Sequence, residues 1–321
     1  MKEDSEGREG GSAEPGTLDS NGGRPAARHR LEYALLKGAF GVLKMLPREA
    51  ATGFGRRAAR LFFRFAPSRR EILRKNLEAA FPEKSAAERE AIGEASVANL
   101  GAAFMEFLGS SKLTREDILS RVVLDGEENF AAARERGKGV FLLSAHFGSW
   151  ELGAIRAGLV ARPIASVVRP LDNPLLEREL EYRRTRLGNR VIRKKQAARE
   201  ILKSLRERQT VAILVDQNVI PEEAIFVPFF GRPAATTPSL ALLQLKTDAA
   251  VVPVFTWPLG GGRYRLKFEK PILAAEFDGE GGREDRVLAA TARYMAVTEQ
   301  AIRGNPGAWL WMHNRWRTRP R

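Results

Sequence analysis

Short apolar runs alternate with amphipathic helical windows along most of the chain, and this alternation restricts the fold more than any other feature. Strand-like runs cover residues 122–124, 140–145, 163–168, 210–215, 250–257 and 264–268. Helical windows cover residues 127–136, 150–161, 174–188, 196–207, 238–247 and 283–303. Strands separated by helices of this length build βαβ units, so the pattern predicts an α/β fold with a mostly parallel sheet flanked by helices.

The predicted sheet is mixed, because a glycine turn joins its last two strands. Three consecutive glycines at 260–262 separate these runs, which predicts a hairpin and one antiparallel pair. The run at 140–145, VFLLSA, is apolar along most of its length, as is typical of a central parallel strand.

The first hundred residues are predicted to be helical after a disordered tail. Residues 1–30 are rich in Gly, Ser and Pro and lack an apolar run, which is typical of disorder. Residues 31–46 place apolar side chains at helical spacing before Pro47. This segment is either a helix lying in the headgroup layer of a membrane or a helix packed on the domain.

Two capping boxes predict further helices in this region. Ser68 with Glu71 marks one start, and Ser85 with Glu88 marks another. The second helix is expected to extend to about Leu108, because Gly109 follows.

The charge balance indicates an anionic partner. Lys and Arg number 53 against 39 Asp and Glu, a net charge of +14, with basic blocks at 54–75 and 178–208. Aromatic residues interleave the first block, which suits an anionic membrane surface, where each base contributes about 1 kcal/mol. A nucleic-acid partner is not predicted, because no helix-turn-helix, zinc-finger or aromatic RNA-binding signature is present.

The sequence also indicates where the protein acts. No uncharged apolar stretch approaches the roughly 18 residues of a membrane-spanning helix, and residues 1–30 lack the layout of a secretory signal. We therefore expect the chain on the cytoplasmic side, peripheral or monotopic at a membrane.

Several chemistries are excluded by residue type and motif. The chain has no cysteine, so disulfides, zinc–cysteine and iron–sulfur sites and a thiolate nucleophile are excluded. It has no G-x-S-x-G elbow, P-loop, strand-linked G-x-G-x-x-G or D-x-D motif. We expect neither a cofactor nor a metal.

His146 is the leading catalytic candidate because it directly follows the apolar run 140–145. Ligands of open α/β sheets bind at the carboxyl ends of strands. Glu151 is five residues on, and within one helix the two side chains would diverge by about 140°. If His146 lies in the loop and Glu151 in the first helical turn, the carboxylate can orient the imidazole as a general base. A capped loop with a structural histidine is the alternative.

The string HFGSWE at 146–151 resembles the H-x-x-x-x-(D/E) signature of glycerolipid and lysophospholipid acyltransferases. The chain is most similar to the lipid A biosynthesis branch, the lauroyl and myristoyl transferases. Further motifs of that branch are matched in order over about residues 31–320. They are RKNL at 74–77 with FP at 81–82, RPLDNP at 169–174, DQN at 216–218, VPFFG at 227–231, ATT at 235–237 and WMHNRWRTRP at 311–320.

The resemblance implies a glycerolipid-acyltransferase-like fold. The chain then divides into a tail (1–30), a helical membrane-associating region (31–110) and an α/β acyltransferase region (111–321) that forms one continuous domain with 31–110. It also implies transfer of a fatty acyl chain from acyl carrier protein, or coenzyme A, to a hydroxyl of a lipid A precursor. The location implied is the cytoplasmic face of the bacterial inner membrane.

The resemblance also implies roles for individual residues. His146 is the general base and Glu151 holds it, while Arg169 and backbone N–H groups near Gly148 stabilise the oxyanion. His313 is expected to pack or to contact the acceptor. The remaining predicted substrate-binding residues are Asn173, Asp216, Gln217, Arg184 and Arg186. For the last two, which would bind lipid phosphates, a solvated helix face is the alternative.

Two other functions remain open at this point. The same chemistry could serve a lysophospholipid, a phosphatidylinositol mannoside or another glycolipid, although Glu151 in place of aspartate disfavours the mannoside. A non-catalytic protein of the membrane surface is the alternative from another class, and the intact His146–Glu151 pair argues against it.

Overall fold

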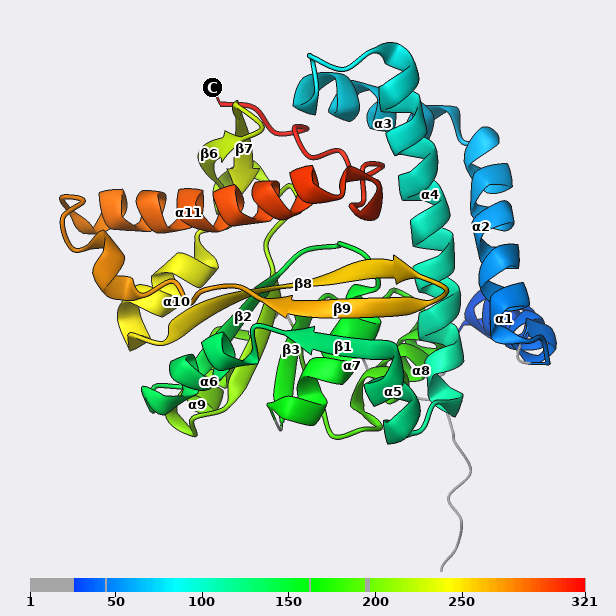
Figure 1. The fold of residues 1–321 in the computed structure, drawn as a ribbon, viewed down its shortest axis with the longest axis horizontal. Helices are drawn as coiled ribbons and strands as arrows, with labels where there is room; N and C mark the ends of the chain where they lie inside the picture. Colours follow the sequence, from blue (N-terminus) through cyan, green and yellow to red (C-terminus); the bar gives the residue numbers. More distant parts are fainter. Residues whose placement is uncertain (1–25, 44, 162, 194–196, 321) are drawn as a thin grey trace, which may run out of the picture.

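The computed structural model describes residues 26–43, 45–161, 163–193 and 197–320 (Figure 1). Helices α1 (Ala27–Leu43), α2 (Arg48–Arg64), α3 (Pro67–Ala80) and α4 (Ala86–Gly109) form its N-terminal part. The long helix α4 runs along one side of the sheet, and α2 packs on its outer side (Figure 1).

In the described part of the chain, seven strands form one sheet in the order β1-β9-β8-β2-β5-β3-β4. They are β1 (Val122–Asp125), β2 (Val140–Ser144), β3 (Ile164–Val168), β4 (Arg190–Arg193), β5 (Thr210–Leu214), β8 (Ala250–Gly260) and β9 (Arg263–Phe268). Neighbouring strands pair in parallel except β8 and β9, which the glycine turn joins as an antiparallel hairpin. The predicted mixed, mostly parallel sheet is confirmed.

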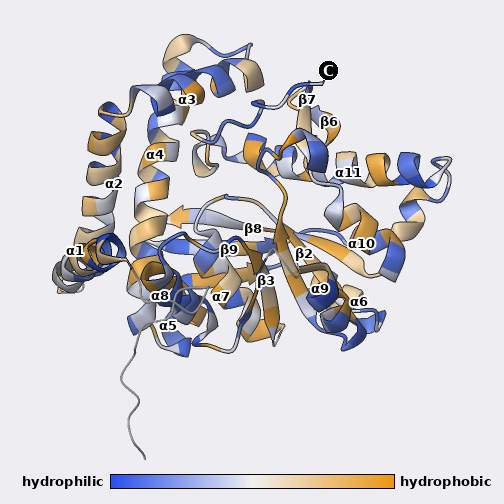
Figure 2. Ribbon diagram, turned by 180° about the vertical axis from the view of Figure 1, so that it is seen from behind, coloured by the Kyte–Doolittle hydropathy of each residue, from blue (hydrophilic) through white to orange (hydrophobic). Residues whose placement is uncertain are grey.

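Helices cover both faces of this sheet. They are α5 (Arg115–Arg121), α6 (Glu127–Glu135), α7 (Trp150–Val160), α8 (Pro174–Thr185), α9 (Ala197–Arg206), α10 (Ser239–Thr247) and α11 (Arg283–Gly304). Side chains alternate along β2, so Phe141 and Leu143 join the cluster under α3, α9, α10 and α11. Val140 and Leu142 join the opposite cluster, with α5, α6 and α7. The central strands are largely hydrophobic, whereas the helices show both colours (Figure 2).

A small hairpin and the C-terminal segment lie on the α11 side of the sheet (Figure 1). The hairpin consists of β6 (Ile225–Phe229) and β7 (Arg232–Thr236). Arg315 is fully buried against it and donates to the Ala235 carbonyl oxygen and to Thr236 Oγ1, each at 2.6 Å. These bonds hold the C-terminal segment against the domain.

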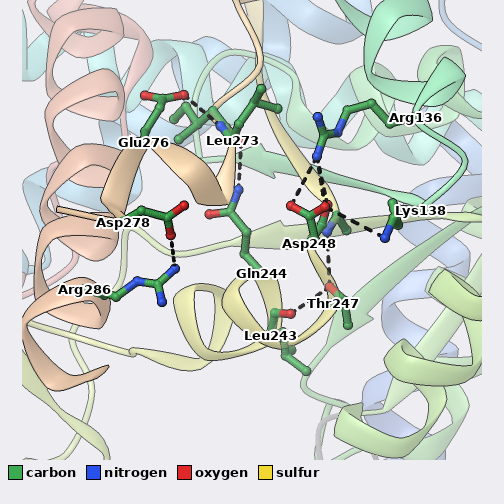
Figure 3. A network of polar contacts seen from close by, with 12 residues as sticks. Arg136, Lys138, Leu243, Gln244, Thr247, Asp248, Leu273, Glu276, Asp278 and Arg286 are labelled. Carbon is green, nitrogen blue, oxygen red and sulfur yellow. Dashed lines mark hydrogen bonds and ion pairs between the residues drawn. The ribbon is translucent and has the colours of Figure 1, made fainter. Parts of the chain in front are cut away.

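Polar contacts fasten the edge of the sheet where β2 and β8 begin (Figure 3). Asp248, at the left-handed end of α10 with φ 56°, accepts two bonds of 3.1 Å from Arg136 Nη2. Nearby, Gln244 Nε2 donates to the Ile272 carbonyl oxygen at 2.7 Å. This edge is structural and lies opposite the carboxyl ends of β2, β5, β3 and β4.

The N-terminal helices match the predictions in part. Helix α4 begins at the predicted capping box, where the Ser85 N–H donates to the Glu88 carboxylate at 2.8 Å. The predicted capping box of Ser68 with Glu71 is wrong, although the helix itself is present. Helix α3 already begins at Pro67, and Glu71 pairs with Arg74 instead. Helix α1 begins within the predicted tail, of which residues 1–25 lie outside the described residues.

Within the described ranges, strands β4, β6 and β7 and helix α5 were not predicted, and α2 was predicted only as part of the helical region 31–110. The four-residue strand β4 has arginine at both ends, which obscures its apolar pattern, and the hairpin strands β6 and β7 contain prolines. Helix α5 has only seven residues, too few for a helical period to be evident.

Helices α2 and α4 approach so closely that glycine is required where they cross. A Cβ at Gly101 would lie 2.2 Å from the Gly55 carbonyl oxygen. We predict that Gly101→Ala separates the helices and lowers the free energy of unfolding by about 1–3 kcal/mol. The matched control is Gly109→Ala, at the end of the same helix, where an added Cβ meets nothing within 4 Å. Urea denaturation checks both variants, and equal midpoints would contradict the prediction.

Candidate functional site

The candidate site lies where β2 and β5 end. These neighbouring parallel strands pair with Ser144 opposite Leu214. His146 and Asp216 each follow two residues later, so the strand register brings them side by side. The carboxyl edge of an open α/β sheet is where such folds bind ligands.

A tight turn after β2 presents the imidazole. Gly148 has φ +60°, and a Cβ there would lie 1.8 Å from the Thr256 carbonyl oxygen, so the turn requires glycine. Helix α7 starts at Trp150, whose ring packs edge-on against His146 with centroids 5.1 Å apart. His146 therefore lies in the loop and Glu151 in the first helical turn, as expected.

The Asp216 carboxylate holds His146 at two points. Its Oδ1 lies 2.9 Å from His146 Nδ1, and its Oδ2 accepts from the His146 backbone N–H at 2.9 Å. Oδ2 also accepts from Trp309 Nε1–H at 2.7 Å. The Asp216 side chain is only 2% exposed, against 21% for His146, so the acid is enclosed and the imidazole reaches the surface.

These contacts set the protonation of the pair. Burial raises the pKa of the Asp216 carboxyl, but the charge of His146 and the bonds from His146 and Trp309 outweigh it and lower the pKa to about 2. Burial lowers the pKa of His146, yet the charge and hydrogen bond of Asp216, with a smaller contribution from Glu151, raise it above its ordinary value. The ionised carboxylate accepts the Nδ1 proton, which leaves the lone pair of the neutral ring on Nε2.

Gln217 covers this second ring nitrogen. Its amide nitrogen lies 3.3 Å from His146 Nε2 and can donate to the lone pair. The one ring atom able to accept a proton therefore faces an amide group that comes from the same loop as Asp216.

The predicted hydrogen bond between the Glu151 carboxylate and the His146 imidazole is not formed. Arg184, from α8, binds the Glu151 carboxylate instead, with Nη2 to Oε1 at 2.6 Å and Nε to Oε2 at 3.0 Å. Both side chains of this pair are 18% exposed. The reason is geometric: Asp216 already occupies the Nδ1 side of the ring, and an arginine fork fits a carboxylate bidentately.

Other predicted site residues have structural partners. The Gly148 N–H donates to the Ala308 carbonyl oxygen at 2.9 Å, so it is not an oxyanion donor here. Asn173 caps α8 by accepting from the Leu175 N–H at 3.0 Å, and its amide nitrogen donates to the Glu32 carboxylate of α1 at 3.0 Å.

The two remaining predicted arginines differ in their surroundings. Arg186 donates to the carbonyl oxygens of Ser110 and Leu113 beyond the end of α4, and its binding of a phosphate stays a prediction. Arg169 is exposed after β3, and no contact joins it to His146 in the described part of the chain.

The C-terminal segment closes the other side of the site. His313 Nε2 accepts from the Asn218 backbone N–H at 2.8 Å, and burial lowers the pKa of His313 to about 4. Asn218 also donates to Thr318 Oγ1 at 3.1 Å. His313 therefore packs as a neutral ring that supports the loop carrying Asp216.

An apolar groove of about 460 Å³ lies near the site, and two of its lining residues, Trp150 and His313, are neighbours of His146. Trp150, which packs on His146, forms one wall, and Phe62 of α2 lies on the rim, 77% exposed. The groove joins the site to the outer surface of α2. Its other lining residues are Ala59, Phe63, Ala66, Arg69, Val97, Leu100, Leu310, Met312 and His313.

In the described ranges, no three acidic or histidine side chains come together as metal ligands. None of the helices in that part of the chain is long and apolar enough to cross a membrane.

Sequence reasoning missed the direct contact of Asp216 with the imidazole and the role of Trp309. The placement of Asp216 two residues after a strand, like His146, was a usable signal once the strand order was known. No sequence signal pointed to Trp309, because a buried tryptophan near a chain end is typical of core packing.

Comparison with known proteins gives consistent matches. A family model described as bacterial lipid A biosynthesis acyltransferase matches residues 23–318. The lipid A biosynthesis lauroyltransferase of Escherichia coli is 28% identical over 287 residues, 88% of this chain and 90% of that protein. A lipid A biosynthesis acyltransferase of Haemophilus influenzae is 31% identical over 263 residues, 78% of each chain. The palmitoleoyltransferase of Escherichia coli is 29% identical over 278 residues, 86% of this chain and 87% of that protein.

The pKa shifts of Asp216 and His146 predict the pH range in which this pair contributes most to the free energy of unfolding. The depressed pKa of Asp216 stabilises the fold above pH 3.8, and this contribution is lost as the pH falls through about 2. The raised pKa of His146 stabilises the fold below pH 6.5, and this contribution is lost as the pH rises through the folded value. The difference in unfolding free energy between wild type and Asp216→Asn should therefore be largest between about pH 4 and 6.5.

Urea denaturation across this pH range measures the difference. Asp278→Asn is the control, because Asp278 forms an exposed pair with Arg286 far from the site. A wild-type advantage over Asp216→Asn that does not vary with pH would contradict the coupling of the two groups.

Proposed function

We propose a reaction for this chain, which belongs to the bacterial lipid A biosynthesis acyltransferase family. It transfers a fatty acyl chain from an acyl carrier protein thioester to a hydroxyl of a lipid A precursor. The observation that carries the proposal is the 2.9 Å contact of Asp216 with His146 Nδ1, which leaves Nε2 as a base. Trp150, which packs on the His146 ring, also lines an apolar groove.

His146 acts as the general base. The acceptor hydroxyl displaces the Gln217 amide from Nε2 and gives its proton to Nε2 as its oxygen attacks the thioester carbonyl. The buried Asp216 carboxylate stabilises the imidazolium that forms, because it accepts the Nδ1–H in both states of the ring. When the carbon–sulfur bond breaks, the imidazolium returns the proton to the thiolate, so the products are an ester and a free thiol.

Gln217 is the donor for the developing oxyanion. Its amide lies 3.3 Å from the reacting nitrogen in the free enzyme, so a small rotation brings its N–H groups to the carbonyl oxygen of the thioester. It replaces the Gly148 N–H in that role, since that N–H already donates to the Ala308 carbonyl oxygen.

Glu151 acts through its charge. Its carboxylate is fixed by Arg184, and it adds to the electrostatic stabilisation of the charged imidazole without a hydrogen bond. The Arg184 guanidinium in turn lies 5.7 Å from the Phe107 ring, a cation–π distance that holds the pair in place.

The groove binds the acyl chain. Its volume of about 460 Å³ is within the range of lipid and cofactor sites, and its walls are largely apolar. A chain lying along it from Phe62 to Trp150 would present its thioester next to His146. Arg69 lies on the same groove and is suited to a phosphate or another acidic group at its opening.

The net charge supports the proposed partners. Acyl carrier protein is acidic and lipid A precursors carry phosphates, so a chain of +14 attracts both, mainly by raising the encounter rate. The same charge favours the anionic cytoplasmic face of the inner membrane, where we place the enzyme.

An exposed face of α2 is the proposed membrane contact. Leu61, Phe62 and Phe65 are 60%, 77% and 76% exposed, and Arg60 and Arg64 are exposed beside them. Aromatic and aliphatic side chains beside cationic ones suit the headgroup layer. Because Phe62 is also on the groove rim, a lipid chain can enter the groove from this face.

Product mass tests the function. The enzyme is incubated with acyl carrier protein thioesters or acyl-coenzyme A, and with a lipid A precursor, a lysophospholipid or a phosphatidylinositol mannoside. We predict that only the lipid A precursor gains an acyl chain, and faster from the carrier protein. Acylation of a different acceptor would contradict the proposed substrate. If no acceptor gains an acyl chain, the proposed acyltransferase activity is wrong.

Site variants extend this test to the mechanism. His146→Ala is expected to abolish transfer, and Asp216→Asn to lower kcat by about two to four decades, the usual range of general-base assistance. Asp248→Asn, in the network at the opposite edge, is the matched control. Activity of His146→Ala within a tenth of wild type would contradict the proposed base.

Vesicle sedimentation tests the membrane contact. Phe62→Ser with Phe65→Ser removes the two most exposed aromatic side chains at the C-terminal end of α2, and we predict a loss of binding to anionic phospholipid vesicles of tenfold or more (about 1.4 kcal/mol). Leu288→Ser, on α11 and 45% exposed, is the control. Equal binding by the double variant and the control would contradict the assignment of this face.

A further inference from the structure

The direction of the Asp216 carboxylate is set by the donors on its second oxygen. The last torsion of an aspartate side chain is broad and roughly two-fold, so the carboxylate can rotate about it. Oδ2 accepts from the His146 backbone N–H at 2.9 Å and from the Trp309 indole N–H at 2.7 Å. With Oδ2 held at these two donors, Oδ1 is aimed at His146 Nδ1.

We propose that Trp309 is a positioning residue, whose indole N–H fixes the Asp216 carboxylate so that Oδ1 stays aimed at the imidazole. The consequence for catalysis rests on the proposed function, whereas the contact itself is independent of any substrate. Trp309 is 1% exposed and touches the base only through Asp216 and the backbone.

The same residue is attached to the loop that carries the base. Trp309 forms a backbone bridge with Phe147, and the Gly148 N–H donates to the Ala308 carbonyl oxygen at 2.9 Å. The peptide at 308–309 therefore fixes the His146 loop through its backbone and Asp216 through its indole. A shift of Trp309 would move both members of the pair.

Side chains of α4 and α3 hold this segment from behind. Ser96 Oγ donates to the Trp309 carbonyl oxygen, and Asn99 Nδ2 donates to the Ala308 carbonyl oxygen at 3.3 Å. Asn76 Nδ2 donates at 2.7 Å to the carbonyl oxygens of two further residues, Trp311 and His313. Asn76 belongs to the N-terminal RKNL string, which thereby acquires a physical role far from the reacting atoms.

Trp311 provides a matched comparison within the same cluster. It is as deeply buried as Trp309, and the two rings pack edge to face with centroids 4.6 Å apart. Its indole N–H donates at 2.7 Å to the Pro306 carbonyl oxygen and not to Asp216. Loss of that N–H removes a part-buried indole hydrogen bond to a backbone carbonyl and leaves the donors of the Asp216 carboxylate in place.

Other charges around the pair are unchanged by a Trp309 substitution. Glu151 faces His146 from α7, and Arg69 of α3 acts on His313. His313 and Arg315 approach Asp216 from the C-terminal segment. A change in the titration of His146 on substitution of Trp309 therefore reports on how His146 is placed relative to the Asp216 carboxylate.

The test uses ¹⁵N-histidine NMR of the full chain without substrate. The sequence has three histidines, and His146→Ala assigns the signal. In Trp309→Phe we expect the His146 ring to lose its preference for the Nδ1–H tautomer and its pKa to fall towards that of Asp216→Asn. In Trp311→Phe both should match wild type. An unchanged or raised pKa in Trp309→Phe, or an equal change in Trp311→Phe, would overturn the proposal.

Kinetics supply a second readout. Because a less basic His146 is deprotonated at lower pH, the acid limb of the kcat profile should move to lower pH in Trp309→Phe, with a lower maximum. Trp311→Phe should leave the position of this limb unchanged. If wild type acylates nothing while the NMR result holds, the proposed function fails and the positioning role stands.

A reciprocal measurement needs no Trp309 variant and so avoids any effect on folding. Asp216→Asn should shift the Trp309 indole N–H signal and speed its exchange with solvent, and it should leave the Trp311 signal in place. Equal behaviour of the two indole signals would refute the contact.

Discussion

The parallel pairing of β2 with β5 is the constraint on which the site depends. It places Ser144 opposite Leu214, and so brings His146 and Asp216, seventy residues apart in sequence, to adjacent positions beyond the sheet. A carboxylate enclosed in this way is stable only if donors satisfy it, and the imidazole, a backbone N–H and an indole supply them. The pairing register of β2 with β5 therefore determines both the sheet and the placement of His146 beside Asp216.

Much of the architecture follows from local sequence. The alternation of apolar runs and helical windows predicted the parallel sheet, the glycine turn predicted its antiparallel hairpin, and Ser85 with Glu88 predicted the start of α4. The position of His146, in the loop between an apolar strand and a helix, also followed from the sequence. These features depend on neighbours along the chain, which is why they could be read without a structure.

The partner of the imidazole could not be read in that way. Glu151 was the nearest acid in sequence, but its carboxylate is bound by Arg184, which comes from another helix. To identify Asp216 required the strand order, because β5 is next to β2 in space although β3 and β4 come between them along the chain. Arg186 likewise has partners from elsewhere in the fold, because it donates to carbonyl oxygens beyond the end of α4.

The groove has a consequence for how the enzyme keeps its shape. Its walls come from α2, α3 and α4 on one side and from residues 310–313 on the other, so an apolar chain within it is a shared core between distant parts of the sequence. Any molecule that binds the folded state alone raises the free energy of unfolding by RT ln(1 + L/Kd), where L is its free concentration. Under the proposed function, resistance to unfolding would depend on the bound acyl chain as well as on the protein.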